Sequence, residues 1–263
     1  MRKDAQSAAF FARLFYVMMH SLVFVVLFSY PNDFKSSLSS ITGSFGVFLV
    51  LKVLGSVLYF TCGISPGYLS QSSFGSLGQL QEEDWDPPEH NYCEACLITQ
   101  PYRTKHCTKC GECVAKYDHH CFWIGSCVGE KNHFRFVVFL CVDSCCFLWG
   151  GYVCLSGLQG DPEAYGAFVV STLICWGFGV LTLGLGFYHI FLISTGTTTW
   201  EAMSRARVTY LKPYPYYFNP FDEGFFENWR KAIFDKELRD WTLPRPRAVY
   251  PFNWCENEYW SCC

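Results

Sequence analysis

Between Cys93 and Cys127 the chain concentrates side chains that can bind a metal or act as nucleophiles. A C-x2-C pair is followed after nine residues by His-Cys, by two cysteines at three-residue steps, and by an Asp-His-His-Cys run with one more cysteine behind it. Zinc takes thiolate and imidazole ligands in sets of four. Two closed zinc sites would therefore use eight of ten cysteine and histidine donors and leave two free. The ten are Cys93, Cys96, His106, Cys107, Cys110, Cys113, His119, His120, Cys121 and Cys127.

The sharper interpretation looks for the free groups in the Asp-His-His-Cys run. In an extended segment side chains alternate faces, so His119 and Cys121 would point one way and His120 the other. A helix would not bring residues two apart together, so this pairing requires a non-helical backbone. Simple alternation places Asp118 with His120, and a local turn is needed for Asp118 to reach His119. The pattern thus predicts an imidazole beside a thiol that no metal holds.

An imidazole beside a thiol has a definite chemistry. A free thiol with a pKa of about 8.5 is mostly protonated at neutral pH, and His119 can take its proton as Cys121 attacks a carbonyl carbon. Asp118 would hold the correct tautomer of His119 and stabilise the imidazolium. A thioester is the natural acyl donor, because thiol–thioester exchange is nearly balanced. The alternative is that the leftover groups are incidental and the module is only a structural zinc domain.

Four apolar stretches flank this module and must position it. A helix needs about 20 predominantly apolar residues to cross about 30 Å of hydrocarbon. We read the first stretch as a retained helix, because it lacks a clear signal-cleavage site and further spans follow. A thiol held against such a bundle suits a fatty acyl group, since each CH₂ in water is unfavourable by about 0.8 kcal/mol. The predicted spans are Leu14–Tyr30, Ile41–Thr61, Phe136–Leu158 and Tyr165–Ile193.

Composition and charge exclude some other classes of protein. The 263 residues are 51% hydrophobic and 19% aromatic, and the formal net charge of −3 gives no basic surplus for binding nucleic acid. Lysines and arginines gather between the second and third spans, whereas Gln159–Ala164, between the third and fourth, has none. The positive-inside rule therefore places the module and both termini in the cytosol. Sixteen cysteines could suggest a disulfide-rich secreted protein, but the cysteines that cluster with histidines fit metal ligation in a reducing compartment better.

The chain divides into four predicted parts. The linker Gln71–His90, rich in Ser, Gly and acids, is expected to be a surface loop, and the tail after Ile193 is expected to form short amphipathic helices. The parts are 1–61 with the first two spans, 62–133 with the linker and the cysteine-rich module, 134–193 with the last two spans, and the cytosolic tail 194–263.

Some polar and cysteine residues lie outside this scheme. Lys52 and Asp143 lie inside predicted spans, where charge is costly, so they are functional candidates; pairing with each other or with polar neighbours would also explain them. His90 and His133 have no predicted role. Cysteines inside the spans are expected to be small apolar fillers. Three cysteines at the C-terminal end could themselves be acylated, namely Cys255, Cys262 and Cys263.

The run from Cys93 to Asn132 resembles the cysteine-rich domain of the DHHC protein palmitoyltransferases. The resemblance rests on the Asp-His-His-Cys tetrad, on Trp123 and on the Cys-Val-Gly that begins at Cys127. Two later motifs agree with it. Thr198-Thr199-Trp200-Glu201 is similar to the family's T-T-x-E motif, and Asn219-Pro220-Phe221-Asp222-Glu223-Gly224, with Asn228 following, resembles its C-terminal motif.

The resemblance implies an all-α polytopic membrane protein with four transmembrane helices and a cytosolic cysteine-rich module that binds two structural zinc ions. It implies a protein-cysteine S-palmitoyltransferase that works in two steps. A long-chain acyl group would pass from acyl-CoA, such as palmitoyl-CoA, through an acyl-Cys121 thioester to membrane-proximal cysteines of cytosol-facing protein substrates. The Golgi or endoplasmic reticulum membrane is the expected location.

The resemblance also assigns residues by position. Asp118, His119 and Cys121 are left for catalysis, Trp123 is expected near the acyl-CoA, and a threonine of the Thr198-Thr199 pair is expected to contact Asp118. The rival hypothesis is a silent membrane adaptor, and the intact catalytic set argues against it. One zinc would take Cys93, Cys96, His106 and Cys113, and the other Cys107, Cys110, His120 and Cys127.

This sequence departs from the family pattern at two places. Phe122 follows the catalytic cysteine where the family usually has proline, which puts the local backbone rigidity in question more than the chemistry. Ser65-Pro66-Gly67 stands where many members have Asp-Pro-Gly after the second span. Neither departure removes a reacting group.

Overall fold

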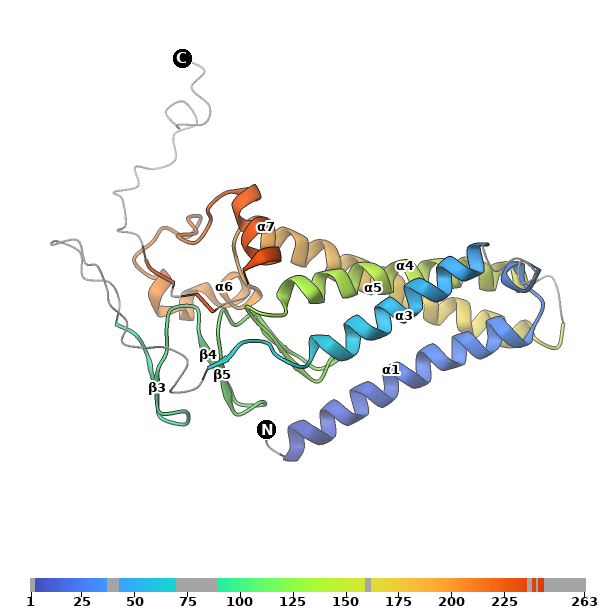
Figure 1. Ribbon diagram of the computed structural model, residues 1–263, viewed down its shortest axis with the longest axis horizontal. Helices are drawn as coiled ribbons and strands as arrows, with labels where there is room; N and C mark the ends of the chain where they lie inside the picture. The colour runs from blue at the N-terminus through green and yellow to red at the C-terminus, as the bar shows by residue number, and fades with distance from the viewer. Residues whose placement is uncertain are drawn as a thin grey trace, which may run out of the picture.

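The computed structural model describes residues 3–36, 43–69, 89–158, 162–235, 238–239 and 241–243. A bundle of long helices forms one end of the molecule and a module of short strands the other (Figure 1). Within these ranges four helices are long and apolar enough to cross a membrane, so the chain is a multi-pass membrane protein, as the sequence predicted. They are α1 (Lys3–Ser29), α3 (Ser44–Cys62), α4 (His133–Gly157) and α5 (Tyr165–Ser194).

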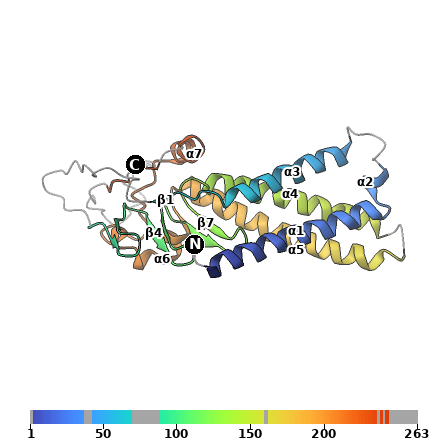
Figure 2. The same ribbon diagram turned by 60° about the horizontal axis from the view of Figure 1, so that its bottom comes forward.

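Small residues allow α4 and α5 to pack closely. A Cβ added to Gly151 would lie 2.1 Å from the Trp176 ring, and one added to Gly157 would lie 2.3 Å from the Phe168 ring. Glycine therefore lets an aromatic ring of α5 rest directly on the α4 backbone, as is common where membrane helices meet. The short helix α2 (Asp33–Ser36) lies between α1 and α3, at the bundle end away from the module (Figure 2).

The module consists of short antiparallel strands. A three-stranded sheet has the order β1 (Tyr68–Leu69), β5 (Glu112–Val114), β4 (Lys105–Cys107). Two separate hairpins are β2 (Tyr92–Cys93) with β3 (Ile98–Thr99), and β6 (His119–Cys121) with β7 (Ser126–Val128). Strands of two or three residues are too short to be stable alone. The all-α fold predicted from the sequence is confirmed for the bundle. The short strands of the module were not part of that prediction.

The first span begins earlier than predicted. The helix α1 begins at Lys3 instead of Leu14, because the alanine-rich segment before the apolar run favours a helix. Its N-terminal end lies beside the module (Figures 1 and 2). There Gly125, in the β6–β7 turn with φ +62°, comes so close that an added Cβ would lie 2.5 Å from Ala9 Cα. Glycine is therefore required both by the turn and by the contact with α1.

The tail folds back against the module and the bundle. The helix α6 (Thr199–Ser204) begins with a capping box, in which the Thr198 side chain accepts from the Glu201 N–H and the Glu201 carboxylate from the Thr198 N–H. Two 3-10 turns follow, Arg205–Arg207 and Thr209–Leu211. The helix α7 (Phe225–Phe234) is joined to the end of α5 where Trp229 Nε1 donates to Ser194 Oγ at 3.0 Å.

The two charges predicted inside spans are linked through a histidine. Lys52 Nζ lies 2.6 Å from His20 Nδ1, and His20 Nε2 lies 3.5 Å from Asp143 Oδ1. A partner inside the bundle lowers the cost of each charge. Several other expectations fall outside the described residues: most of the linker Gln71–His90, part of Gln159–Ala164, and the cysteines Cys255, Cys262 and Cys263.

Candidate active site

The strand β6 places the side chains of the Asp-His-His-Cys run on two opposite faces. Because β6 is extended, His120 points to the opposite face from His119 and Cys121. His120 Nδ1 lies 3.6, 3.4 and 3.6 Å from the Sγ atoms of Cys107, Cys110 and Cys127. Four donor atoms from β4, β6, β7 and the turn after β4 therefore converge on one point.

A second group of four donors lies around His106. Its Nδ1 is 3.5, 3.3 and 3.9 Å from the Sγ atoms of Cys93, Cys96 and Cys113. Within each group of four, all donor atoms lie within 4.8 Å of one another. Zinc bonds of about 2.3 Å to sulfur and about 2.0–2.1 Å to nitrogen place the ligand atoms of a tetrahedral site about 3.5–3.8 Å apart. Both groups fit such an ion in donor type and spacing.

Asp118 is held between the module and the tail. Its side chain is fully buried, Oδ2 lies 2.7 Å from His119 Nδ1, and Oδ1 accepts from the Thr199 N–H at 2.8 Å. The contact expected from the T-T-x-E motif is thus made by the backbone at the start of α6. The carboxylate reaches His119 rather than His120, because Asp118 precedes β6 and does not follow its alternation.

This arrangement strengthens His119 as a base. Burial by itself would lower the pKa of His119, but the hydrogen bond to Asp118 and the neighbouring Cys121 sulfur outweigh it and raise that pKa to about 9. Burial would likewise raise the pKa of Asp118, but the surrounding histidines hold it below its ordinary value. Asp118 therefore stays ionised and favours the imidazolium that would form when His119 takes a proton.

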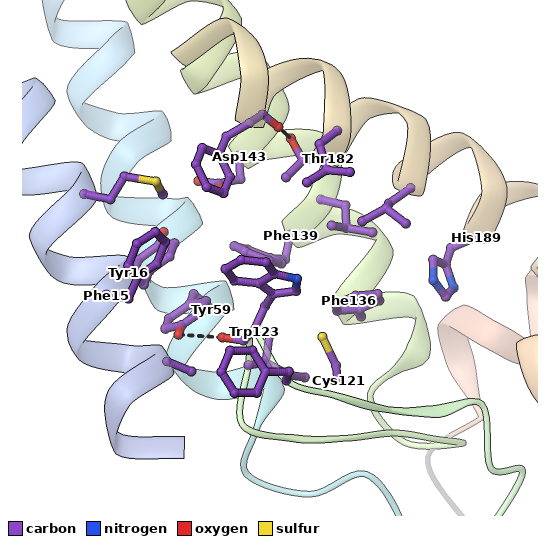
Figure 3. A pocket seen from close by; sticks show the side chains of 18 of the residues that line it. Phe15, Tyr16, Tyr59, Cys121, Trp123, Phe136, Phe139, Asp143, Thr182 and His189 are labelled. Carbon is purple, nitrogen blue, oxygen red and sulfur yellow. Dashed lines mark hydrogen bonds between the residues drawn. The ribbon is translucent and has the colours of Figure 1, made fainter. Parts of the chain in front are cut away.

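Cys121 lies at the mouth of an apolar cavity of about 340 Å³ that extends into the bundle. Figure 3 shows its sulfur beside Phe136, with Trp123 and Phe139 deeper along the wall and Asp143 at the far end. All four membrane helices and β6 contribute to the lining. The thiol is only 6% exposed, so it faces this cavity rather than open water.

The comparisons with known proteins agree with this geometry. Residues 86–206 match the family model described as DHHC palmitoyltransferase. The human protein "Palmitoyltransferase ZDHHC12" is 38% identical over 191 residues, which cover 68% of this chain and 70% of that protein. The chain belongs to the DHHC palmitoyltransferase family. The family predicted from the sequence is therefore confirmed.

Other members of the family also match this DHHC protein. "Putative ZDHHC-type palmitoyltransferase 7" of Dictyostelium discoideum is 35% identical over 190 residues, or 66% of this chain and 43% of that protein. "Probable protein S-acyltransferase 2" of Arabidopsis thaliana is 30% identical over 172 residues, or 59% of this chain and 39% of that protein. The chain thus spans less than half the length of these two relatives. Their names and the matching family model support protein palmitoylation.

Trp123 of this DHHC protein forms part of the wall of the cavity that Cys121 also lines. Its ring centroid lies 5.9 Å from that of Phe15 on α1 and 6.1 Å from that of Phe178 on α5. Its backbone carbonyl accepts a hydrogen bond from Tyr59 on α3 at 2.9 Å (Figure 3). Phe122 also lines the cavity, with its ring centroid 5.9 Å from that of Trp123, but it is 57% exposed.

Two histidines near Asp118 were not assigned from the sequence. His189 on α5 lines the cavity, and its Nδ1 lies 3.9 Å from Asp118 Oδ2 and 3.0 Å from His133 Nε2. His133, at the start of α4, lies 4.0 Å from Asp118 Oδ1. The signal for His189 was present, because an ionisable side chain within an apolar span is a functional candidate by default.

Arg103 was also missed as a residue that positions the site. Its guanidinium bonds Glu201 through two nitrogens at 2.7 and 2.6 Å, and it donates to the Gly196 carbonyl at 2.8 Å. The ring centroids of Phe221 and Trp241 lie 4.3 and 4.4 Å from its Cζ. Arg103 thereby joins the module to the segment that holds Asp118.

Proposed function

We propose that this protein is a protein-cysteine S-palmitoyltransferase that passes a long-chain acyl group from acyl-CoA, through a thioester on Cys121, to cysteines of other proteins. One observation carries the proposal. The Cys121 thiol lies outside both four-donor groups, at the mouth of an apolar cavity and on the same face as His119. A free nucleophile, a base and a space for an aliphatic chain therefore meet at one place.

The first half-reaction follows from this arrangement. Cys121 Sγ attacks the carbonyl carbon of the acyl-CoA thioester while His119 takes the thiol proton. The bond between that carbon and the CoA sulfur breaks, and the proton passes from His119 to the departing CoA thiolate. Asp118, which holds His119 by Nδ1, leaves Nε2 of the ring free for both transfers.

The second half-reaction repeats these steps with a protein thiol. The incoming cysteine gives its proton to His119 and attacks the acyl carbon, and Cys121 departs and recovers the proton. One thioester is exchanged for another in each half-reaction, so neither is strongly uphill. The same imidazole thus serves as base and then as acid.

The cavity favours a long aliphatic chain. Its lining is mainly aromatic and aliphatic, and each CH₂ removed from water contributes about 0.8 kcal/mol. A chain bound there would have its carbonyl end at Cys121 and its tail pointing toward Asp143. Trp123 would lie beside the thioester end.

Two zinc ions fit the four-donor groups around His106 and His120. When bound, they supply cross-links between strands too short to hold a fold by themselves, and they take no part in the transfer. His120 would therefore be a ligand, although it is adjacent to the base His119. This division leaves Asp118, His119 and Cys121 for the chemistry.

The module is proposed to face the cytosol, where acyl-CoA and substrate proteins are found. The charge asymmetry of the loops supports this orientation, and the N-terminal end of α1 lies at the same end of the bundle as the module (Figure 1). Cys121 lies where the bundle meets the module, so the substrates would carry cysteines close to the membrane. The Golgi or endoplasmic reticulum membrane is proposed as the location.

The test measures acyl-enzyme and metal on the same purified variants. Wild-type protein mixed with palmitoyl-CoA should form a hydroxylamine-sensitive adduct and contain two zinc ions. Cys121→Ser and His119→Ala should lose most of the adduct and keep both ions. Cys96→Ala and Cys110→Ala should lose metal and structure together, because metal binding contributes to folding.

Cys145→Ser is the matched control, because Cys145 is an exposed thiol on α4. It should be labelled like the wild type. An adduct that persists in Cys121→Ser, or a zinc ion lost from that variant, would show that Cys121 is not the free nucleophile.

A further inference from the structure

A third group of potential metal ligands lies inside the active site, apart from the two cysteine-rich groups. It consists of Asp118, His119 and His189, with one donor atom of each within 4.8 Å of the others. Asp118 Oδ2 lies 2.7 Å from His119 Nδ1 and 3.9 Å from His189 Nδ1. The group joins the start of β6 to the C-terminal part of α5, where Figure 3 shows His189.

These distances are close to those that a small divalent ion requires. Zinc bonds of about 2.0–2.1 Å to nitrogen and carboxylate oxygen place two ligand atoms about 3.3 Å apart. The 2.7 Å distance from Asp118 to His119 would have to lengthen by about 0.6 Å, and the 3.9 Å distance from Asp118 to His189 would have to shorten by about 0.6 Å. Small side-chain rotations can supply both changes. Two imidazoles and one carboxylate form a donor set used by zinc sites that keep a fourth position for water.

The electrostatics favour a cation at this point. Within the described part of the chain, the ion-pair neighbours of the Asp118 carboxylate are three histidines, with no lysine or arginine among them. Its side chain is fully buried, whereas that of His119 is 28% exposed and His189 lines the cavity. An ion could therefore reach this carboxylate through the cavity, where it would replace the proton through which His119 Nδ1 bonds Asp118.

His133 would not bind the ion itself but would form hydrogen bonds to the residues that do. Its Nε2 bonds His189 Nδ1 at 3.0 Å and lies 4.0 Å from Asp118 Oδ1. If His189 turned its Nδ1 to an ion, the His133 N–H could move to Asp118 Oδ1 and orient the carboxylate. Hydrogen bonds of this kind to ligating carboxylates are common behind metal sites.

We propose that Asp118, His119 and His189 form a third metal site, which binds Zn²⁺ reversibly and inhibits acyl transfer when occupied. Its inhibitory part rests on the proposed function. An ion on His119 Nδ1 displaces the proton that bonds Asp118 and draws electron density from the ring, so Nε2 accepts the Cys121 proton less readily. Mg²⁺ and Ca²⁺ should not compete, because both prefer oxygen ligands.

The metal site is tested first without reference to activity. Full-length protein in detergent is equilibrated with buffered Zn²⁺ and its zinc content is measured. Wild type should bind three ions, His189→Ala and His189→Gln two, and Cys121→Ser three. His90→Gln is the matched control, since His90 Nδ1 lies 3.1 Å from the Gln100 carbonyl, outside this group, and it should bind three.

Cobalt identifies the ligands of the third ion. Co²⁺ added to protein that already holds two zinc ions should give weak visible bands without the intense sulfur-to-cobalt charge transfer of a thiolate site. A third ion that persists in both His189 variants, or that is lost from Cys121→Ser, would overturn the assignment. So would a wild type that never exceeds two ions.

Inhibition is then measured as the loss of acyl-enzyme formation with rising free Zn²⁺, each variant being compared with its own zinc-free rate. His189→Gln should require at least about 10-fold more Zn²⁺ than wild type for half inhibition, because even the loss of a residue behind a ligand weakens metal binding by about 10–100-fold. Equal sensitivity of the two proteins would refute regulation through this site. If wild type binds three ions but forms no acyl-enzyme even without the third, the proposed function fails and the site remains.

Discussion

The buried ion pair between Arg103 and Glu201 should connect the stability of the module to that of the tail. Both side chains are at most 2% exposed, and two nitrogens of the guanidinium bond the two carboxylate oxygens. Removing one partner from a buried pair leaves an uncompensated charge and costs about 3–5 kcal/mol. We therefore expect Arg103→Met to lower the free energy of unfolding by about that amount.

The double variant sharpens this prediction. In Arg103→Met the hydrogen-bond partners left to the Glu201 carboxylate among the described residues are the Tyr210 hydroxyl, at 3.0 Å, and the Thr198 N–H, at 2.9 Å. Adding Glu201→Gln removes the stranded charge, so the double variant should be destabilised by less than the sum of the two single variants. For residues in contact, this difference is about 0.5–3 kcal/mol.

The assay is reversible denaturant unfolding in mild detergent, followed by tryptophan fluorescence. Arg230→Met is the matched control, because Arg230 pairs with Glu227 on the surface of α7 with 53% of its side chain exposed. An exposed pair contributes little to stability, because water screens the charges. The reasoning is refuted if Arg103→Met costs no more than Arg230→Met, or if the two substitutions at the buried pair are additive.

Three further predictions concern the active site and the membrane. Asp118→Asn should slow acyl-Cys121 formation by about 10²-fold or more while both zinc ions remain, because His119 loses the charge that stabilises its imidazolium; an unchanged single-turnover rate would contradict this role. Phe122→Pro should keep or raise acylation, since proline fixes φ near about −65° beside the nucleophile; a folded but unlabelled variant would indicate a different backbone geometry. Tags at both termini and in Gln71–His90 should be cytosolic and one in Gln159–Ala164 lumenal, and a protected linker tag in a protease assay would reverse the orientation.

The parts that could be predicted depend on local signals. Each membrane helix is specified by the length of its own apolar run, so Ile41–Thr61 was found as α3 within a few residues. The extended backbone at His119–Cys121 followed from the requirement that residues two apart share a face. The number of possible metal-binding cysteines and histidines could also be counted directly from the sequence. Their division into two groups of four came from the family resemblance.

The parts that could not be predicted depend on contacts between distant segments. Arg103 and Glu201 are 98 positions apart, and no local pattern indicates that they meet. His189 joins Asp118 only because α5 ends beside β6. The turn that brings Asp118 to His119 was recognised as necessary, but the backbone partner that holds the carboxylate, the Thr199 N–H, is 81 positions away. Long-range packing decides these contacts.

The position of the proposed nucleophile therefore depends on all three parts of the fold at once. The β6–β7 hairpin holds Cys121 and is tied to the four-donor group around His120 through His120 and Cys127. The bundle forms the cavity that Cys121 faces. The tail fixes Asp118 through Thr199, and Arg103 joins that tail back to the module. The tail orients His119 indirectly, because it holds Asp118 and Asp118 bonds His119. Any change that lets the module move relative to the tail should therefore misplace the His119 ring before it displaces the Cys121 thiol. Acylation should thus be lost under milder destabilisation than zinc binding.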